Sequence, residues 1–143
     1  MKTLLKNTAP ALLILLFAYA ATSKLMDLNL FRHEMYNQNF PKEIAGALIV
    51  LIPAAEILAI LLLLISKWQV AGLLFSVLLM TAFTGYTALV LAGYWDRVPC
   101  SCGGVLQNMS WTAHFFFNLF FLALAAAALA QRYKGNAENL RKE

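Results

Sequence analysis

The sequence has little charge and little cysteine. Asp, Glu, Lys and Arg make up 13% of its 143 residues, about half the share that soluble domains carry, whereas hydrophobic residues make up 62%. This composition excludes an ordinary soluble domain. The formal net charge of +4 is no sign of nucleic-acid binding, because the basic residues are scattered around the ends of apolar runs. The two cysteines, Cys100 and Cys102, are too few for a zinc site with four cysteine ligands.

The apolar residues form four long runs. A helix of roughly 20 residues crosses the hydrocarbon core of about 30 Å, and such a run must be helical because every backbone polar group in lipid needs a partner. We therefore predict an all-α membrane protein whose single domain, residues 1–143, is a bundle of four transmembrane helices. The expected helices cover about residues 8–26, 44–65, 70–93 and 111–130. The polar residues 131–143 are expected to form a frayed cytoplasmic tail.

The first apolar run has features of both a signal peptide and a membrane helix. A basic start and the small-x-small site Ala18-Tyr19-Ala20 are typical of a cleavable secretory signal. The run continues beyond that site to Met26, which favours a transmembrane helix that is not cleaved.

The connection between the first two runs has a pattern of its own. Residues 27–43 carry apolar side chains at positions i, i+3 and i+7, namely Leu28, Phe31 and Met35. This spacing predicts a short helix that lies in the membrane interface, with an ordinary loop as the alternative.

Polar residues inside the expected helices are candidates for function. Glu56 lies near the middle of the second helix, where a carboxylate costs at least ~2.5–3.5 kcal/mol, so we expect it to be protonated or paired and to face the bundle interior. It could carry protons, or serve only as a hydrogen-bonding contact between helices. His114 and Asn118 share a face of the fourth helix because they stand four residues apart. His114 could hold a proton or stabilise a thiolate, or could only fill an interfacial position.

Hydroxyl side chains are expected to have local roles. Those in the second half of the third helix should donate to carbonyl groups of their own helix, and they are Thr81, Thr84, Tyr86 and Thr87. Ser110 is expected to cap the N-terminus of the fourth helix.

The distribution of Lys and Arg predicts the orientation in the membrane. Basic residues collect on the cytoplasmic side. They are most frequent at the N-terminus, between the second and third helices, and in the tail: Lys2, Lys6, Lys67, Arg132, Lys134, Arg141 and Lys142. We therefore expect a multi-pass protein of the inner membrane with both termini in the cytoplasm. The loop that contains Cys100 and Cys102 would then lie in the periplasm, a compartment that permits disulfides.

The cysteines stand one residue apart in the polar segment between the third and fourth helices. Pro99 before them and Gly103 after them favour a turn, in which Cys100 and Cys102 can approach closely enough for a disulfide. A bridge in so small a ring is strained and exchanges readily, whereas a structural bridge would gain little from closing so short a loop. Two alternatives stay open: free thiols without a role, or a soft-metal site to which His114 adds a ligand.

These features resemble the MauE-type proteins of the DoxX-like membrane family. The matching segments are Ser23-Lys24-Leu25-Met26-Asp27 with Phe31, Pro53-Ala54-Ala55-Glu56, and Cys100-Ser101-Cys102-Gly103-Gly104 ahead of a helix with Asn118. The resemblance implies that the cysteines are a redox pair. It also implies that Lys24, Glu56 and Asn118 belong to a polar framework, which makes them candidates for binding a cofactor. The methylamine-utilisation branch is linked to maturing a periplasmic dehydrogenase rich in disulfides, alongside a thioredoxin-like partner.

We therefore expect a membrane thiol–disulfide redox protein. Its cysteine pair would exchange electrons with a periplasmic thioredoxin-like protein or a disulfide-containing client, and the catalytic candidates are Cys100, Cys102, His114 and Glu56. A quinone is the candidate electron acceptor. Four-helix thiol oxidases of the vitamin K epoxide reductase kind relay electrons to a quinone through a second cysteine pair, which this chain does not share. The alternative is a non-enzymatic membrane subunit or assembly factor whose cysteines bind a soft metal or a client.

Overall fold

A computed structural model shows a helical bundle. It describes residues 2–96 and 110–140, with side chains for residues 7–96 and 110–135. The elements are α1 (Lys2–Met26), α2 (Leu28–Tyr36), α3 (Lys42–Leu64), the 3-10 turn η1 (Ser66–Trp68), α4 (Gln69–Leu91) and α5 (Trp111–Leu140). Four helical stretches are long and apolar enough to span a membrane: Asn7–Met26, Lys42–Leu64, Ser66–Leu91 and Trp111–Gly135. The predicted all-α fold with four membrane-spanning helices is confirmed, and α2 is the short helix expected between the first two.

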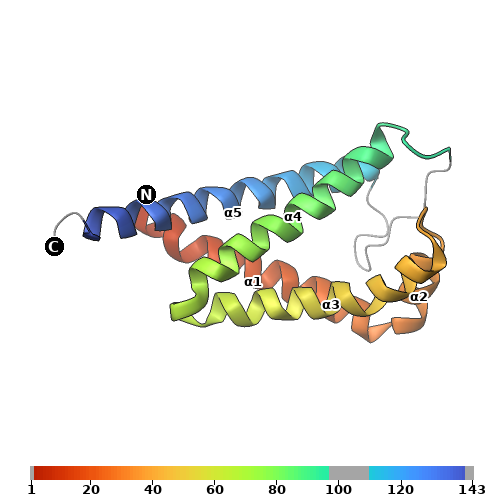
Figure 1. Cartoon of the computed structure of the whole chain (residues 1–143), viewed down its shortest axis with the longest axis horizontal. Coiled ribbons are helices and arrows are strands. Elements are labelled where there is room, and N and C mark those ends of the chain that lie inside the picture. The colour runs from red at the N-terminus through yellow and green to blue at the C-terminus, as the bar shows by residue number, and fades with distance from the viewer. Residues whose placement is uncertain (1, 97–109, 141–143) are drawn as a thin grey trace.

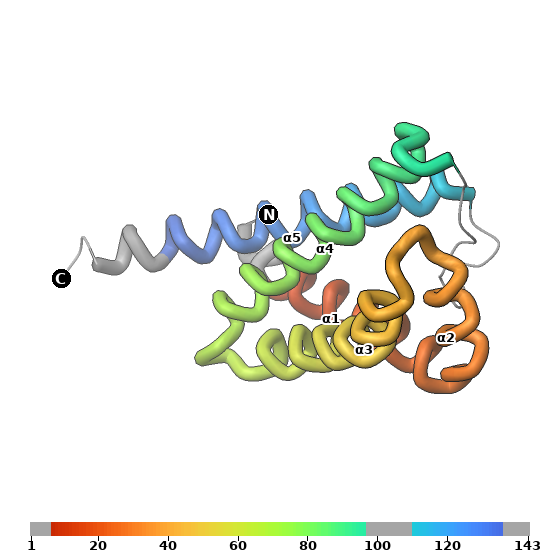
Figure 2. The backbone as a smooth tube through the Cα atoms, turned by 45° about the vertical axis from the view of Figure 1, so that its right-hand side comes forward, coloured from red at the N-terminus to blue at the C-terminus, as the bar shows by residue number. Residues whose placement is uncertain are grey.

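Two pairs of helices make up the bundle. α1 packs along α3, and α4 packs along α5, while α3 and α4 are joined through the short η1 turn. The N-terminus and the η1 turn lie at one end of the molecule, and α2 lies at the other (Figure 1). From the η1 end towards the α2 end, α4 and α5 separate from α1 and α3 (Figure 1 and Figure 2).

The main hydrophobic core fills the half of the bundle next to η1. Its largest buried members come from three helices and are Leu13, Phe17, Leu63, Leu73 and Met80. Alanines of α5, Ala125 and Ala128, complete this cluster and let the helices approach closely. A second, smaller cluster joins α2 to the start of α3. The space between these two clusters is where a cavity forms.

α2 folds back onto the bundle. Its N-terminus is capped by Asp27, whose carboxylate accepts a hydrogen bond from the Leu30 backbone N–H at 2.9 Å. Phe31 and Met35 are buried against α3, whereas Leu28, which the spacing put on the same face, is largely exposed. α2 therefore covers the end of the bundle with two of the three apolar residues of the predicted face, Phe31 and Met35.

The C-terminus of α4 and the N-terminus of α5 are both capped. Gly93 has a φ of 69°, and the backbone N–H groups of Gly93 and Tyr94 bond to the carbonyls of Val90 and Leu89, which is the Schellman pattern of a helix end. The Ser110 hydroxyl accepts a hydrogen bond from the Ala113 N–H at 3.2 Å, so the predicted N-cap is confirmed.

The expected helix end at about residue 130 was wrong, because α5 continues to Leu140. Arg132 donates a hydrogen bond to the Gln69 side chain, which in turn donates to the Leu63 carbonyl at 3.3 Å. These contacts attach α5 to the η1 end through Arg132, a residue that was expected to lie in the frayed tail. Hydropathy alone cannot detect such a continuation, since it marks where a helix leaves lipid and not where it ends.

Close approach at η1 requires a glycine at position 72. A Cβ atom at Gly72 would lie 2.8 Å from the Leu63 backbone nitrogen and 2.9 Å from the Leu62 carbonyl carbon. Both atoms belong to backbone and cannot move aside without shifting a helix. A Cβ at Gly85, in the same helix, would meet nothing within 4 Å.

We therefore expect Gly72→Ala to lower the free energy of unfolding by about 1–3 kcal/mol, the usual cost of overpacking. Gly85→Ala is the matched control and should leave stability unchanged or raise it by up to about 1 kcal/mol, because alanine is the better helix former. Denaturation of the purified protein in detergent micelles measures both. Equal effects of the two substitutions would contradict the close packing of α4 against the end of α3.

Candidate functional site

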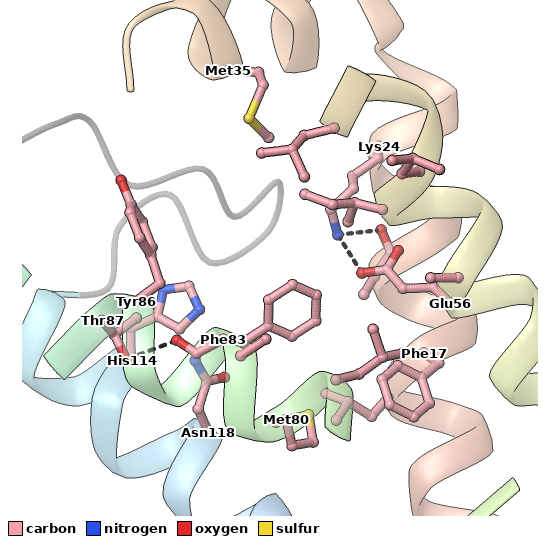
Figure 3. Close-up of a pocket in the computed structure, with 18 of the residues that line it drawn as sticks. Phe17, Lys24, Met35, Glu56, Met80, Phe83, Tyr86, Thr87, His114 and Asn118 are labelled. Atoms are coloured by element: carbon pink, nitrogen blue, oxygen red, sulfur yellow. Dashed lines mark hydrogen bonds and ion pairs between the residues drawn. The ribbon is translucent and has the colours of Figure 1, made fainter. Parts of the chain in front are cut away.

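A cavity of about 430 Å³ lies in the half of the bundle next to α2, a volume in the range of small-molecule sites. All four long helices and the α2 segment contribute to its wall, which is mostly apolar and aromatic. A few polar side chains converge on it: Lys24, Gln38, Glu56, Thr87, His114 and Asn118. Figure 3 shows Lys24 and Glu56 on one side of this space and His114 and Asn118 on another.

A buried ion pair forms one wall of the cavity. Lys24 Nζ lies 2.8 Å from Glu56 Oε1, and the two side chains are only 14% and 2% exposed. Lys24 belongs to the last turn of α1, whereas Glu56 lies well inside α3. The two meet because a helical side chain points towards the N-terminus of its own helix. Accordingly, Lys24 Nζ also donates to the Ala20 carbonyl, 3.1 Å away and one turn back.

Two buried polar atoms at the cavity have no partner among the described residues. They are Glu56 Oε2 and His114 Nδ1, one from α3 and one from α5. Buried polar atoms nearly always have a hydrogen-bond partner, so an exception marks a place where something else supplies one. A ligand or a water molecule in the cavity between these two atoms can supply the missing hydrogen bonds.

An aromatic cluster surrounds Tyr86 at the α2 end of the cavity. The Tyr86 ring centroid lies 5.2 Å from that of Phe40, 5.5 Å from Trp95 and 6.2 Å from Trp111. Trp111 also stacks on the His114 ring, with centroids 6.4 Å apart and an interplanar angle of 18°. This stacking holds the His114 imidazole at the cavity wall and not on the lipid-facing side of α5.

Hydroxyl groups of α4 divide between local and distant partners. Thr81 and Thr87 donate to carbonyls one turn back in their own helix, at 2.7 and 3.1 Å, as predicted. The same prediction was wrong for Tyr86, whose hydroxyl donates to Gln38 Oε1 beyond the end of α2. It was also wrong for Thr84, whose hydroxyl has no partner in the described part of the chain. A phenol ring holds its hydroxyl too far from its own helix for a local bond, and this distance could have signalled the difference.

Four of the candidate site residues named from the sequence line this one cavity: Lys24, Glu56, His114 and Asn118. Glu56 faces the bundle interior and is paired, as expected for a membrane helix. Cys100 and Cys102 lie outside the described residues, and the roles of all these side chains stay predictions. The sequence interpretation did not select Gln38, Phe40 or Trp111, because aromatic and polar residues at helix ends are also typical of the membrane interface.

The ion pair makes a sharp prediction about stability. Lys24→Met leaves the Glu56 carboxylate buried without its cation, which should lower the free energy of unfolding by about 3–5 kcal/mol. The double variant Lys24→Met/Glu56→Leu removes both charges and should recover most of that loss. Denaturation in detergent micelles measures the cycle, with Lys67→Met in the exposed η1 turn as the control. The cycle also includes the single variant Glu56→Leu. Additive effects of Lys24→Met and Glu56→Leu on stability would contradict a direct pairing.

The family model of the methylamine utilisation protein MauE matches residues 2–131. No curated protein and no solved structure gives a significant match. The matched range contains the four apolar helices, both cysteines and every polar residue that lines the cavity. The expected MauE kinship is thereby confirmed, and it implies a membrane protein of methylamine utilisation. The protein, a multi-pass membrane protein with a polar cavity at one end of its bundle, belongs to the MauE family of methylamine utilisation proteins.

Proposed function

We propose that this protein is a thiol–disulfide exchange protein of the inner membrane, acting through Cys100 and Cys102 on the periplasmic side. Its partner is a periplasmic thioredoxin-like protein or a client that contains disulfides. Both termini and the η1 turn, with Lys67, face the cytoplasm, in keeping with the larger number of basic residues there. The observation that carries the proposal is the convergence of buried ionisable groups at the end of the bundle to which the cysteine segment is joined.

The described residues on either side of the cysteine segment lie at that end of the bundle. Asp96 is the last residue described before the cysteines. Its neighbour Trp95 packs against Tyr86 of the cavity wall, with ring centroids 5.5 Å apart. Cys100 follows Asp96 by four positions. Four residues of fully extended chain span at most about 14 Å, which is compatible with the proposed exchange at this end of the bundle. On the other side of the cysteines, Ser110 caps the helix that carries His114.

Groups at the cavity suit the chemistry of thiol exchange. Exchange requires a thiolate, which attacks a sulfur of a disulfide and forms a mixed disulfide; a second thiolate then resolves it, leaving one protein with a disulfide and the other with a dithiol. A nearby imidazole or carboxylate can accept the thiol proton, and a nearby ammonium group favours the thiolate. His114, Glu56 and Lys24 supply one group of each kind.

The redox state of the cysteines tests this proposal. In membranes equilibrated with graded glutathione or dithiothreitol, alkylation should reveal one reversible two-electron transition that the Cys100→Ser/Cys102→Ser variant lacks. Each single Cys→Ser variant should instead trap a mixed disulfide with the partner, since the second cysteine that would resolve it is missing. Thiols that stay reduced throughout, yet become protected when copper or zinc is added, would overturn the proposal in favour of metal binding.

The proposed orientation predicts the accessibility of the cysteines. A membrane-impermeant maleimide should label the reduced pair in intact spheroplasts. In a Cys100→Ser/Cys102→Ser background, Lys67→Cys in the exposed η1 turn is the matched control and should react only after lysis. Labelling of Lys67→Cys in intact spheroplasts, with the native pair protected, would show the opposite topology.

A further inference from the structure

The cavity reaches the lipid-facing surface of the bundle. Two of its lining residues lie on facing helices and are exposed: Leu51 of α3, at 59%, and Ala82 of α4. Both lie within membrane spans, where an exposed side chain faces lipid. α3 and α4 meet at η1 and separate towards the α2 end (Figure 1). The cavity therefore opens to the bilayer between these two helices, and its ligand can arrive by diffusion in lipid.

The polar groups of the cavity restrict the chemistry of that ligand. Glu56 Oε2 can only accept a hydrogen bond when the carboxylate is ionised, and its side chain is 2% exposed. The Lys24 ammonium has three donors, of which Glu56 and Ala20 use two. His114 Nδ1 can accept or donate, depending on its tautomer. A lipid acyl chain satisfies none of these atoms, whereas a ring whose oxygens alternate between carbonyl and hydroxyl can accept from Lys24 and His114 in one state and donate to Glu56 in the other.

We propose that the cavity binds the ring of a lipid-soluble quinone, which enters from the bilayer between α3 and α4 past Leu51 and Ala82. In the oxidised state, the ring carbonyls accept from Lys24 Nζ and from His114. In the reduced state, a quinol hydroxyl donates to Glu56 Oε2. The aromatic and aliphatic wall, which includes Phe17 and Phe83, accommodates the ring and the first part of its tail (Figure 3).

The quinone's role as electron acceptor rests on the proposed thiol exchange, whereas its binding does not. When the reduced cysteine pair is oxidised, two S–H bonds break and one S–S bond forms. The two electrons and two protons released convert one quinone to one quinol, so the step needs no further oxidant. Quinol then leaves through the same opening and is replaced by quinone from the membrane.

Photolabelling and equilibrium binding test the site. The probe is a decyl benzoquinone that carries a diazirine at the far end of its tail, added to the purified full-length protein in detergent. Adducts should concentrate at the opening near Leu51 and Ala82 and should be removed by excess unlabelled decyl benzoquinone. Adducts confined to Tyr19, an exposed lining residue of α1, would overturn the opening between α3 and α4. Adducts spread evenly over the lipid-facing helix surfaces would overturn the site itself.

Substitutions with matched controls give the second measurement. Leu51→Trp and Ala82→Trp should each weaken quinone binding by about tenfold or more, because a large ring then fills the opening. Leu58→Trp and Leu78→Trp place the same side chain on exposed positions of the same helices that do not line the cavity, and they should bind as the native protein does. Glu56→Gln, which keeps the shape but removes the charge, should weaken binding of the quinol more than that of the quinone. Equal effects of the opening and control substitutions would contradict the inference.

The Cys100→Ser/Cys102→Ser variant separates the two proposals. Quinone binding that persists in this variant, while the native pair shows no exchange with any thiol partner, would leave the site in place and remove the proposed function. Reversible thiol exchange in a protein that binds no quinone would leave the proposed function in place and remove the quinone site. Oxidation of the native reduced pair by one equivalent of decyl benzoquinone, with loss of that reaction in Leu51→Trp but not in Leu58→Trp, would support both.

Discussion

The ion pair between Lys24 and Glu56 is the interaction on which the site depends. Each charge alone would be costly at this depth, and together they neutralise each other across 2.8 Å. The pair fixes α1 relative to α3, because Lys24 reaches its partner only by pointing back along its own helix. It also leaves the second carboxylate oxygen of Glu56, a residue of the cavity wall, buried without a partner among the described residues. A hydrophobic pair of similar volume could join the two helices as well, so the charges are better explained by what they present to a ligand.

The two ends of the bundle have different constructions, and this difference creates the cavity. At the η1 end, Gly72 and small side chains allow close helix contact, and Arg132 ties α5 to Gln69. At the α2 end the helix pairs separate, and aromatic rings around Tyr86 occupy part of the space. A tightly packed end can hold the helix axes in place while the other end stays open. The proposed chemistry belongs to the open end, where the described residues on either side of the cysteine segment lie.

Much of the fold and part of the site could be predicted from the sequence. The apolar runs predicted the four spans, because a segment that crosses lipid must satisfy its backbone polar groups as a helix. The Ser110 cap followed from residue type and position. Glu56, His114 and Asn118 were found because polar residues are conspicuous in such runs. Their meeting with Lys24 in one cavity could not be found this way, since it depends on how α1 and α5 pack. The link from Tyr86 to Gln38 joins elements far apart in the sequence, for which no local pattern exists. The continuation of α5 past residue 130 likewise depends on the tertiary contact of Arg132.

In the proposed function, a single cysteine pair constrains how electrons would cross from a periplasmic protein to the membrane. Proteins with two pairs can use one sulfur pair outside and another beside the acceptor, whereas here the same two sulfurs must react with both. The acceptor then has to come to the cysteines. A cavity with the proposed opening to lipid would meet this requirement; Trp111 lines it, and Trp95 packs against Tyr86 of its wall. The unsatisfied oxygen of Glu56 and nitrogen of His114 fit the same requirement, because a ligand that must come and go cannot be replaced by permanent protein partners.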